Sequence, residues 1–147
     1  MKPRGPKSFT ASEHGASTVE FALVVVPLLL VVFGIVEYGR LMWTQAAIQE
    51  TAMAAARCMG LKQASCATNG TYSQSQTLSY VQTKGQNWSI SIPTSGVTLN
   101  NSATCSGTSG FSQVTISFTF TSAVPLLLAS LSNGVNIHAV ACFPNQS

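Results

Sequence analysis

Hydrophobic and polar positions change their pattern twice along the chain. Residues 21–36 carry no charged or hydrogen-bonding side chain. From Glu37 to Arg57 apolar residues recur at helical spacing instead, and the predicted buried stripe comprises Tyr38, Leu41, Met42, Ile48, Ala52 and Ala56. No Gly–Pro pair or polar cluster interrupts residues 17–58. We therefore expect one helix over these residues, about 63 Å long at ~1.5 Å per residue.

A helix of that length is too long for a chain of 147 residues to surround. One end must lie outside the globular part, and the apolar end can sit in a bilayer. Residues 21–36 alone span ~24 Å, short of a hydrocarbon core of ~30 Å, whereas counting from Ala16 gives ~31 Å. Pro27 falls inside this span, where it cannot donate to the Leu23 carbonyl, so we expect a helix kink there. A proline that the membrane helix simply tolerates is the alternative.

The C-terminal half shows the two-residue period of strands. Residues 114–121 alternate without exception, and Val135, Ile137, Ala139, Ala141 and Phe143 form one face of a last strand. Trp88, Ile90 and Ile92 predict another strand, ended by Pro93. Residues 73–84 are a candidate short helix ending at Gly85, and the rest of 63–113 is polar and interpreted as loops. The predicted fold class is α+β: a long N-terminal helix, transmembrane then amphipathic, packed on a small antiparallel sheet.

Charge is concentrated at the beginning of the chain. The net charge is +3, and Lys2, Arg4 and Lys7 supply three of the seven basic residues. Positive residues beside a membrane segment favour the cytoplasmic side, which predicts a cytoplasmic N-terminus. Residues 85–147 contain no Asp, Glu, Lys or Arg. A surface with so little charge suits a protein that is built into an assembly. The positive net charge, which comes mainly from the N-terminus, does not indicate a nucleic-acid partner.

Four cysteines follow the apolar segment, which indicates two disulfides in an oxidising compartment. Three pairings are possible, and we favour Cys58–Cys66 together with Cys105–Cys142. A zinc site is the rival interpretation, but the chain has no C-x-x-C pair. We therefore expect no metal and no cofactor.

Glu20 is the unusual residue of the apolar stretch. A carboxylate in a membrane span costs at least ~2.5 kcal/mol. It either lies at the headgroup boundary or awaits a cation from a partner protein.

The residues around Glu20 carry a resemblance to a known family. Gly15 is followed by Ala16, with Glu20 five residues after Gly15, and then by Phe21-Ala22-Leu23 and Pro27. This pattern resembles the N-terminus of TadE-like pseudopilins, minor pilins of the tight-adherence (Tad or Flp) pilus. The resemblance covers about residues 13–60. It implies cleavage between Gly15 and Ala16 by a membrane prepilin peptidase, and pairing of Glu20 with the new amino group of Ala16 in a neighbouring pilin.

These inferences divide the chain into four parts. They are a leader (1–15), the transmembrane and assembly part of the helix (16–36), its amphipathic outer half (37–59) and a disulfide-stapled, β-rich periplasmic region (60–147). The resemblance implies a single-pass inner-membrane protein that takes part in initiating, capping or anchoring a pilus used for surface attachment. Its expected partners are the prepilin peptidase, other pilins and inner-membrane lipid.

Two other interpretations remain open. One is a single-pass anchored periplasmic binding or structural protein with an uncleaved N-terminus. The other is a secretory signal peptide, against which stand Glu20, Pro27 and a helical pattern that continues past Arg40.

Catalysis is not expected. The sequence offers no paired carboxylates, nucleophile–base set, phosphate loop or evident small-molecule site, and we assign His138 to the surface. One further surface is predicted between the last two strands, where a cluster of leucines is too large for a short segment to bury. We expect it to contact another pilin or the membrane, with cover by long loops as the alternative; the patch comprises Leu126, Leu127, Leu128 and Leu131.

Overall fold

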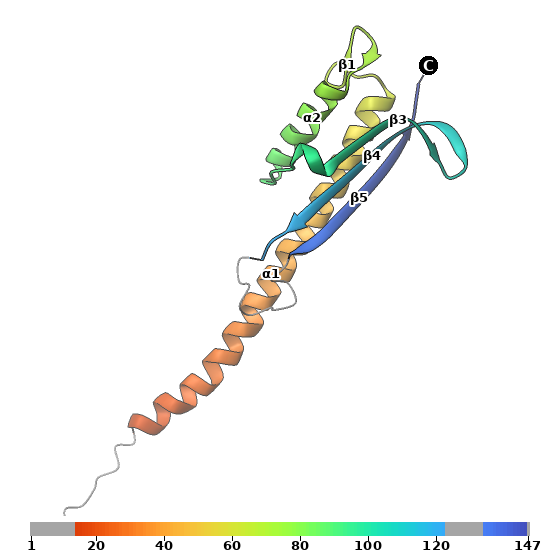
Figure 1. Ribbon diagram of the computed structural model, residues 1–147. Coiled ribbons are helices and arrows are strands. Elements are labelled where there is room, and N and C mark those ends of the chain that lie inside the picture. The colour runs from red at the N-terminus through yellow and green to blue at the C-terminus, as the bar shows by residue number, and fades with distance from the viewer. Residues whose placement is uncertain (1–13, 123–133, 147) are drawn as a thin grey trace, which may run out of the picture. The chain divides into compact units, whose positions relative to one another are not determined.

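The computed structural model describes residues 14–122 and 134–146. The chain divides into two compact units, Met1–Val36 and Glu37–Ser147. The elements, shown in Figure 1, are α1 (His14–Gly60), β1 (Ala67–Thr68), β2 (Thr71–Tyr72), α2 (Gln74–Asn87), the 3-10 turn η1 (Thr94–Gly96), β3 (Val97–Cys105), β4 (Thr108–Phe120) and β5 (Val135–Pro144). A long helix with a small antiparallel sheet is the α+β class that the sequence predicted.

The N-terminal part of α1 is an uninterrupted helix through Pro27, within a helix of 47 residues. By length and composition, α1 is the one helix in the described residues that could cross a membrane, with a mean hydropathy of 2.8 in its most apolar window. Its apolar side chains are exposed, as Phe21 at 69% and Leu23 at 71% illustrate. A surface of this kind requires lipid or a protein partner.

The larger sheet of the second unit has the order β3-β4-β5, with antiparallel pairing throughout, and β1 and β2 form a separate antiparallel pair. Its register places Val114 opposite Ala141 and Ile116 opposite Ala139, so the large inward side chains of β4 meet small ones of β5. This face packs on α1 through residues that are small or slender, which lets helix and sheet approach closely; on α1 they are Ala47, Ile48, Ala52, Ala55, Ala56 and Met59.

The buried face of α1 differs from the predicted stripe. Ile48, Ala52 and Ala56 are buried as expected, but Tyr38 and Met42 are 63% and 40% exposed. Thr44 and Thr51 are buried instead. Their hydroxyls donate to carbonyl oxygens one turn back, those of Arg40 at 2.9 Å and Ala47 at 2.8 Å. A threonine that satisfies its own hydroxyl within the helix can occupy an apolar position, which a hydrophobicity pattern does not detect.

Helix α2 ends at Asn87 rather than at Gly85. Gly85 is buried, and a Cβ there would lie 2.8 Å from Cδ1 of Ile92 and 2.9 Å from the Ile90 carbonyl oxygen. The amides of Trp88 and Ile90 both donate to the Gly85 carbonyl, and Ser89 has a φ of 59°, so the chain reverses there. The strand predicted over 88–92 was therefore wrong. Ile90 and Ile92 fill the core from this irregular segment.

Strands β4 and β5 confirm the alternation read from the sequence, whereas β3 was not predicted. The inward-facing residues of β3 are Val97, Leu99, Asn101 and Ala103. The polar Asn101 and the small Ala103 interrupt the alternation of large apolar and polar residues that would have predicted a strand. Asn101 is compatible with this position because its side-chain oxygen accepts a hydrogen bond from the Ser112 hydroxyl of β4 at 2.8 Å.

Candidate functional site

Glu20 lies on the exposed, apolar part of α1. Its neighbours Val19 and Phe21 are 60% and 69% exposed. Glu20 follows Ala16 by four residues in the same helix. The sequence thus sets a single carboxylate within a long apolar surface, close to the predicted cleavage point at Gly15.

That apolar surface extends along the helix to Val36. Its large side chains are between 45% and 71% exposed: Val19, Phe21, Leu23, Val24, Val26, Leu28, Leu29, Leu30, Val31, Val32, Phe33, Ile35 and Val36. They occur at nearly every position and so surround the helix. A helix that is apolar on all sides is typical of a membrane span or of the interior of a protein assembly.

A partly buried ion pair begins the second unit. Glu37 is only 3% exposed, and its Oε2 accepts a hydrogen bond from Nη1 of Arg40 at 2.9 Å. The Arg40 guanidinium carbon lies 5.7 Å from the centre of the Phe120 ring, at the end of β4. The cation therefore offsets the buried carboxylate and contacts the sheet. Sequence reasoning missed this pair, although the i, i+3 spacing of opposite charges was a usable signal.

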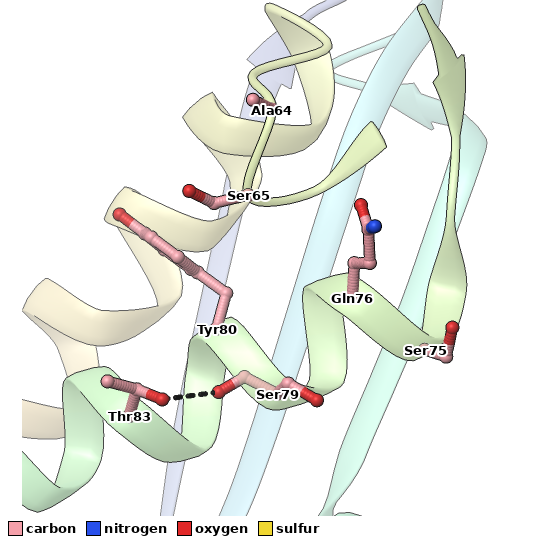
Figure 2. Close-up of a pocket in the computed structure, with 7 residues that line it drawn as sticks. All are labelled: Ala64, Ser65, Ser75, Gln76, Ser79, Tyr80 and Thr83. Carbon is pink, nitrogen blue, oxygen red and sulfur yellow. Dashed lines mark hydrogen bonds between the residues drawn. The ribbon is translucent and has the colours of Figure 1, made fainter. Parts of the chain in front are cut away.

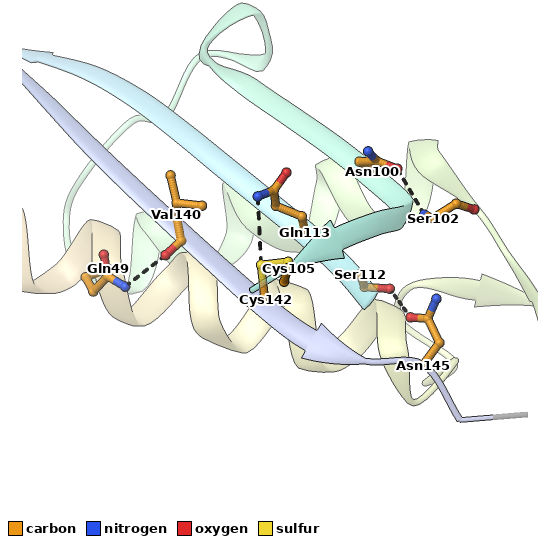
Figure 3. The surroundings of a disulfide bond; sticks show 9 residues. All are labelled: Gln49, Asn100, Ser102, Cys105, Ser112, Gln113, Val140, Cys142 and Asn145. Carbon is orange, nitrogen blue, oxygen red and sulfur yellow. Dashed lines mark hydrogen bonds between the residues drawn. A yellow bond between two sulfur atoms is a disulfide. The ribbon is translucent and has the colours of Figure 1, made fainter. Parts of the chain in front are cut away.

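Two disulfides are present, with the pairing that the sequence favoured. Cys58–Cys66 joins the end of α1 to the residue before β1, and both residues are fully buried. Cys105–Cys142 joins the end of β3 to β5, as Figure 3 shows. Near this end of the sheet the Asn145 side-chain nitrogen donates to the Asn101 carbonyl oxygen at 2.7 Å. The disulfide and this hydrogen bond hold together the end of the sheet at which β5 finishes.

The surface also carries a hollow of about 480 Å³ beside α2. Its lining is neutral and rich in hydroxyl and amide groups, as Figure 2 shows: Ala64, Ser65, Ser75, Gln76, Ser79, Tyr80 and Thr83. The Thr83 hydroxyl donates to the Ser79 carbonyl at 2.9 Å. Nearby in sequence, burial raises the pKa of the Tyr72 phenol above its ordinary value of 10.0.

Metal-ligating side chains do not gather in the described part of the chain. Residues 14–122 and 134–146 contain no group of three His, Cys, Asp or Glu side chains placed to hold a metal. His138 is exposed on β5, and its Nδ1 lies 3.1 Å from the Ser117 hydroxyl oxygen. This agrees with the surface position assigned to it.

Two predicted features lie outside the described residues. They are the basic part of the leader, residues 1–13, and the leucine patch of Leu126, Leu127, Leu128 and Leu131. Both stay predictions.

Comparison with known proteins adds one finding. The model of the family described as TadE-like protein matches residues 15–57, nearly all of α1. Searches of curated proteins and of solved structures gave no match. A long apolar helix joined to a small disulfide-linked sheet fits a membrane-anchored pilus protein. Over residues 15–57 the chain is similar to TadE-like proteins, which confirms the resemblance found in the sequence and suggests involvement in Tad pilus systems.

Proposed function

We propose that the chain is a minor pseudopilin that takes part in assembling a Tad pilus for surface attachment, by initiating the fibre, capping it or joining its base. The observation that carries this proposal is the family match over α1, a helix whose apolar part is exposed on all sides. Such a surface can be covered first by lipid and then by other pilin helices.

The proposed assembly step uses the first turns of α1. Cleavage between Gly15 and Ala16 by a prepilin peptidase would create a free amino group at Ala16. In an apolar environment that cation and the Glu20 carboxylate of a neighbouring subunit each need an opposite charge. A contact between unlike surfaces of successive subunits generates an open helical polymer. Glu20 would therefore select and align the neighbouring pilin.

The second unit would remain on the periplasmic side before assembly. Its two disulfides suit an oxidising compartment. Lys2, Arg4 and Lys7 would hold the N-terminus in the cytoplasm until processing.

Processing gives the direct test. The protein recovered from membranes of cells with an active prepilin peptidase should begin at Ala16, as read by N-terminal sequencing. Gly15→Val should block cleavage, because a side chain then stands beside the scissile bond. Gly34→Val is the matched control, since a Cβ at Gly34 meets nothing within 4 Å, and it should be processed normally. An uncleaved wild-type N-terminus would overturn the proposal.

A second function is supported by the hollow beside α2. A neutral, hydroxyl-lined depression of about 480 Å³ could belong to a periplasmic binding protein with an uncleaved anchor. Retention of residues 1–15 in the presence of the peptidase would favour this function over the first.

A further inference from the structure

The chain contains two tryptophans, and the structure brings them together. Trp43 belongs to α1, and Trp88 directly follows the last residue of α2. Their ring centroids lie 5.5 Å apart with the planes at 71°, an edge-to-face contact. Although they touch, Trp43 stays 60% exposed and Trp88 37% exposed. The pair is thus a large aromatic surface that the described part of the second unit leaves uncovered.

The position of Trp43 along α1 indicates what covers this surface. Trp43 follows Val36, the last residue of the apolar stretch, by seven positions in the same helix. At ~1.5 Å per residue this corresponds to ~10 Å of helix. The headgroup layers add ~5–8 Å on each side of the hydrocarbon core. Side chains of a helix point back toward its N-terminus, so the Trp43 ring lies nearer the apolar stretch than its Cα does. Indole rings are favoured in this layer because they combine an apolar body with a polar N–H.

The side chains around the pair suit the same layer. Tyr38 and Met42, on the turns between Val36 and Trp43, are also exposed. Lys84, one turn before Trp88, lines a hollow together with Glu50 and Trp88 itself. Lys84 and Glu50 have opposite formal charges, so the side chains that line this hollow beside Trp88 carry no net charge that would oppose contact with lipid.

We propose that Trp88, held against Trp43, docks the C-terminal end of α2 into the phospholipid headgroup layer of the membrane that α1 spans. The proposal rests on the membrane anchoring in the proposed function. The occupant is the lipid interface, because the pair follows the apolar helix directly and carries the amphipathic chemistry of that layer. Docking would hold the second unit down on the bilayer until assembly withdraws it.

Single-tryptophan variants of the full chain in lipid nanodiscs test the proposal. Trp43→Phe leaves Trp88 as the reporter, and Trp88→Phe leaves Trp43. Each is measured in nanodiscs whose lipids carry bromine near the headgroup end of the acyl chains, and separately with acrylamide as an aqueous quencher. A third variant combines both substitutions with Met53→Trp. Met53 is 47% exposed on α1 and lies ten residues beyond Trp43, so it reports on water-exposed surface. Peptide mapping of both disulfides verifies the fold of each variant.

The expected result is strong loss of Trp88 fluorescence with brominated lipid, comparable to the loss for Trp43, and weak quenching by acrylamide. The Met53→Trp reporter should show the reverse. If Trp43 is quenched by lipid but Trp88 only by acrylamide, docking is wrong while anchoring stands. If brominated lipid quenches neither, anchoring and docking both fail. If Trp88 is shielded from both quenchers, a protein surface covers it and the lipid proposal is overturned. If Trp43→Phe alters the disulfide pattern, the wild-type chain with fluorinated tryptophans provides the same test through the response of its fluorine signals to paramagnetic lipid.

Discussion

Glu20 provides the clearest prediction for a single residue. We expect Glu20→Ala to be cleaved at Gly15 but to assemble poorly. Removing one partner of a buried ion pair costs ~3–5 kcal/mol, which corresponds to more than ~100-fold in affinity between subunits. Electron microscopy of piliation and N-terminal sequencing measure the two effects separately. Glu20→Asp retains the charge and should recover part of the assembly. Wild-type piliation with Glu20→Ala would exclude the pairing.

Gly60 is a residue whose missing side chain matters. A Cβ there would lie 2.7 Å from Cδ1 of Phe143 and 2.9 Å from the Pro144 carbonyl oxygen. Gly60→Ala should therefore destabilise the second unit by about 1–3 kcal/mol through overpacking. Gly39→Ala is the matched control, because a Cβ there meets nothing within 4 Å, and replacing a helical glycine should stabilise by ~0.5–1 kcal/mol. Thermal unfolding in one detergent compares both variants. Equal midpoints for the two would contradict the packing at the end of α1.

At the scale of elements, the two disulfides should differ in their response to reductant. Cys58 and Cys66 are fully buried, whereas Cys142 is exposed, so a mild reductant should open Cys105–Cys142 first. Cys105–Cys142 also closes the longer loop, with a sequence separation of 37 against 8 for Cys58–Cys66. In the chain-entropy model it therefore stabilises the folded state by ~4 kcal/mol, compared with ~2.5 kcal/mol for Cys58–Cys66. Alkylation followed by peptide mapping measures the order. Labelling of Cys58 before Cys142 would contradict it.

Elements were predictable from the sequence where one period persisted over many residues. Strand β4 alternates regularly along its predicted part, and β5 does so through small alanines, so both were found. Strand β3 was not predicted because the polar Asn101 occupies an inward position. Its side-chain oxygen accepts a hydrogen bond from Ser112 of the next strand, a partner that the local sequence does not indicate. The Trp88–Ile92 segment has the alternation of a strand without being one. Its backbone is fixed by Gly85 and by the turn at Ser89, and local periodicity does not record either constraint.

For the molecule as a whole, the candidate site could be read from the sequence only where its residues are neighbours in the chain. The Gly15, Ala16 and Glu20 spacing is local, and the family match covers it. The contact of Arg40 with Phe120 and that of Trp43 with Trp88 join residues far apart in the sequence. Each depends on the packing of α1 against β4 or α2. No spacing rule encodes such pairs, so only the folded second unit reveals them.

The last prediction concerns the independence of that second unit. Its core cluster draws all its members from α1 beyond Val36, α2, the segment after it and the sheet, and none from residues 14–36. A chain of residues 37–147, oxidised, should therefore fold alone and unfold in one cooperative step, with an enthalpy near ~75 kcal/mol for ~110 residues at about 60 °C.

Two substitutions on opposite faces of the sheet sharpen this test. Ile116 is fully buried, so Ile116→Ala should cost about 2–5 kcal/mol. Val140 is 51% exposed on the neighbouring strand, and Val140→Ala should change stability by no more than ~0.5 kcal/mol. Calorimetry measures both in the isolated unit. A gradual transition, or equal effects of the two substitutions, would mean that the core needs the apolar part of α1. The two units would then be one cooperative structure, and withdrawal of the helix from the membrane could not leave the sheet intact.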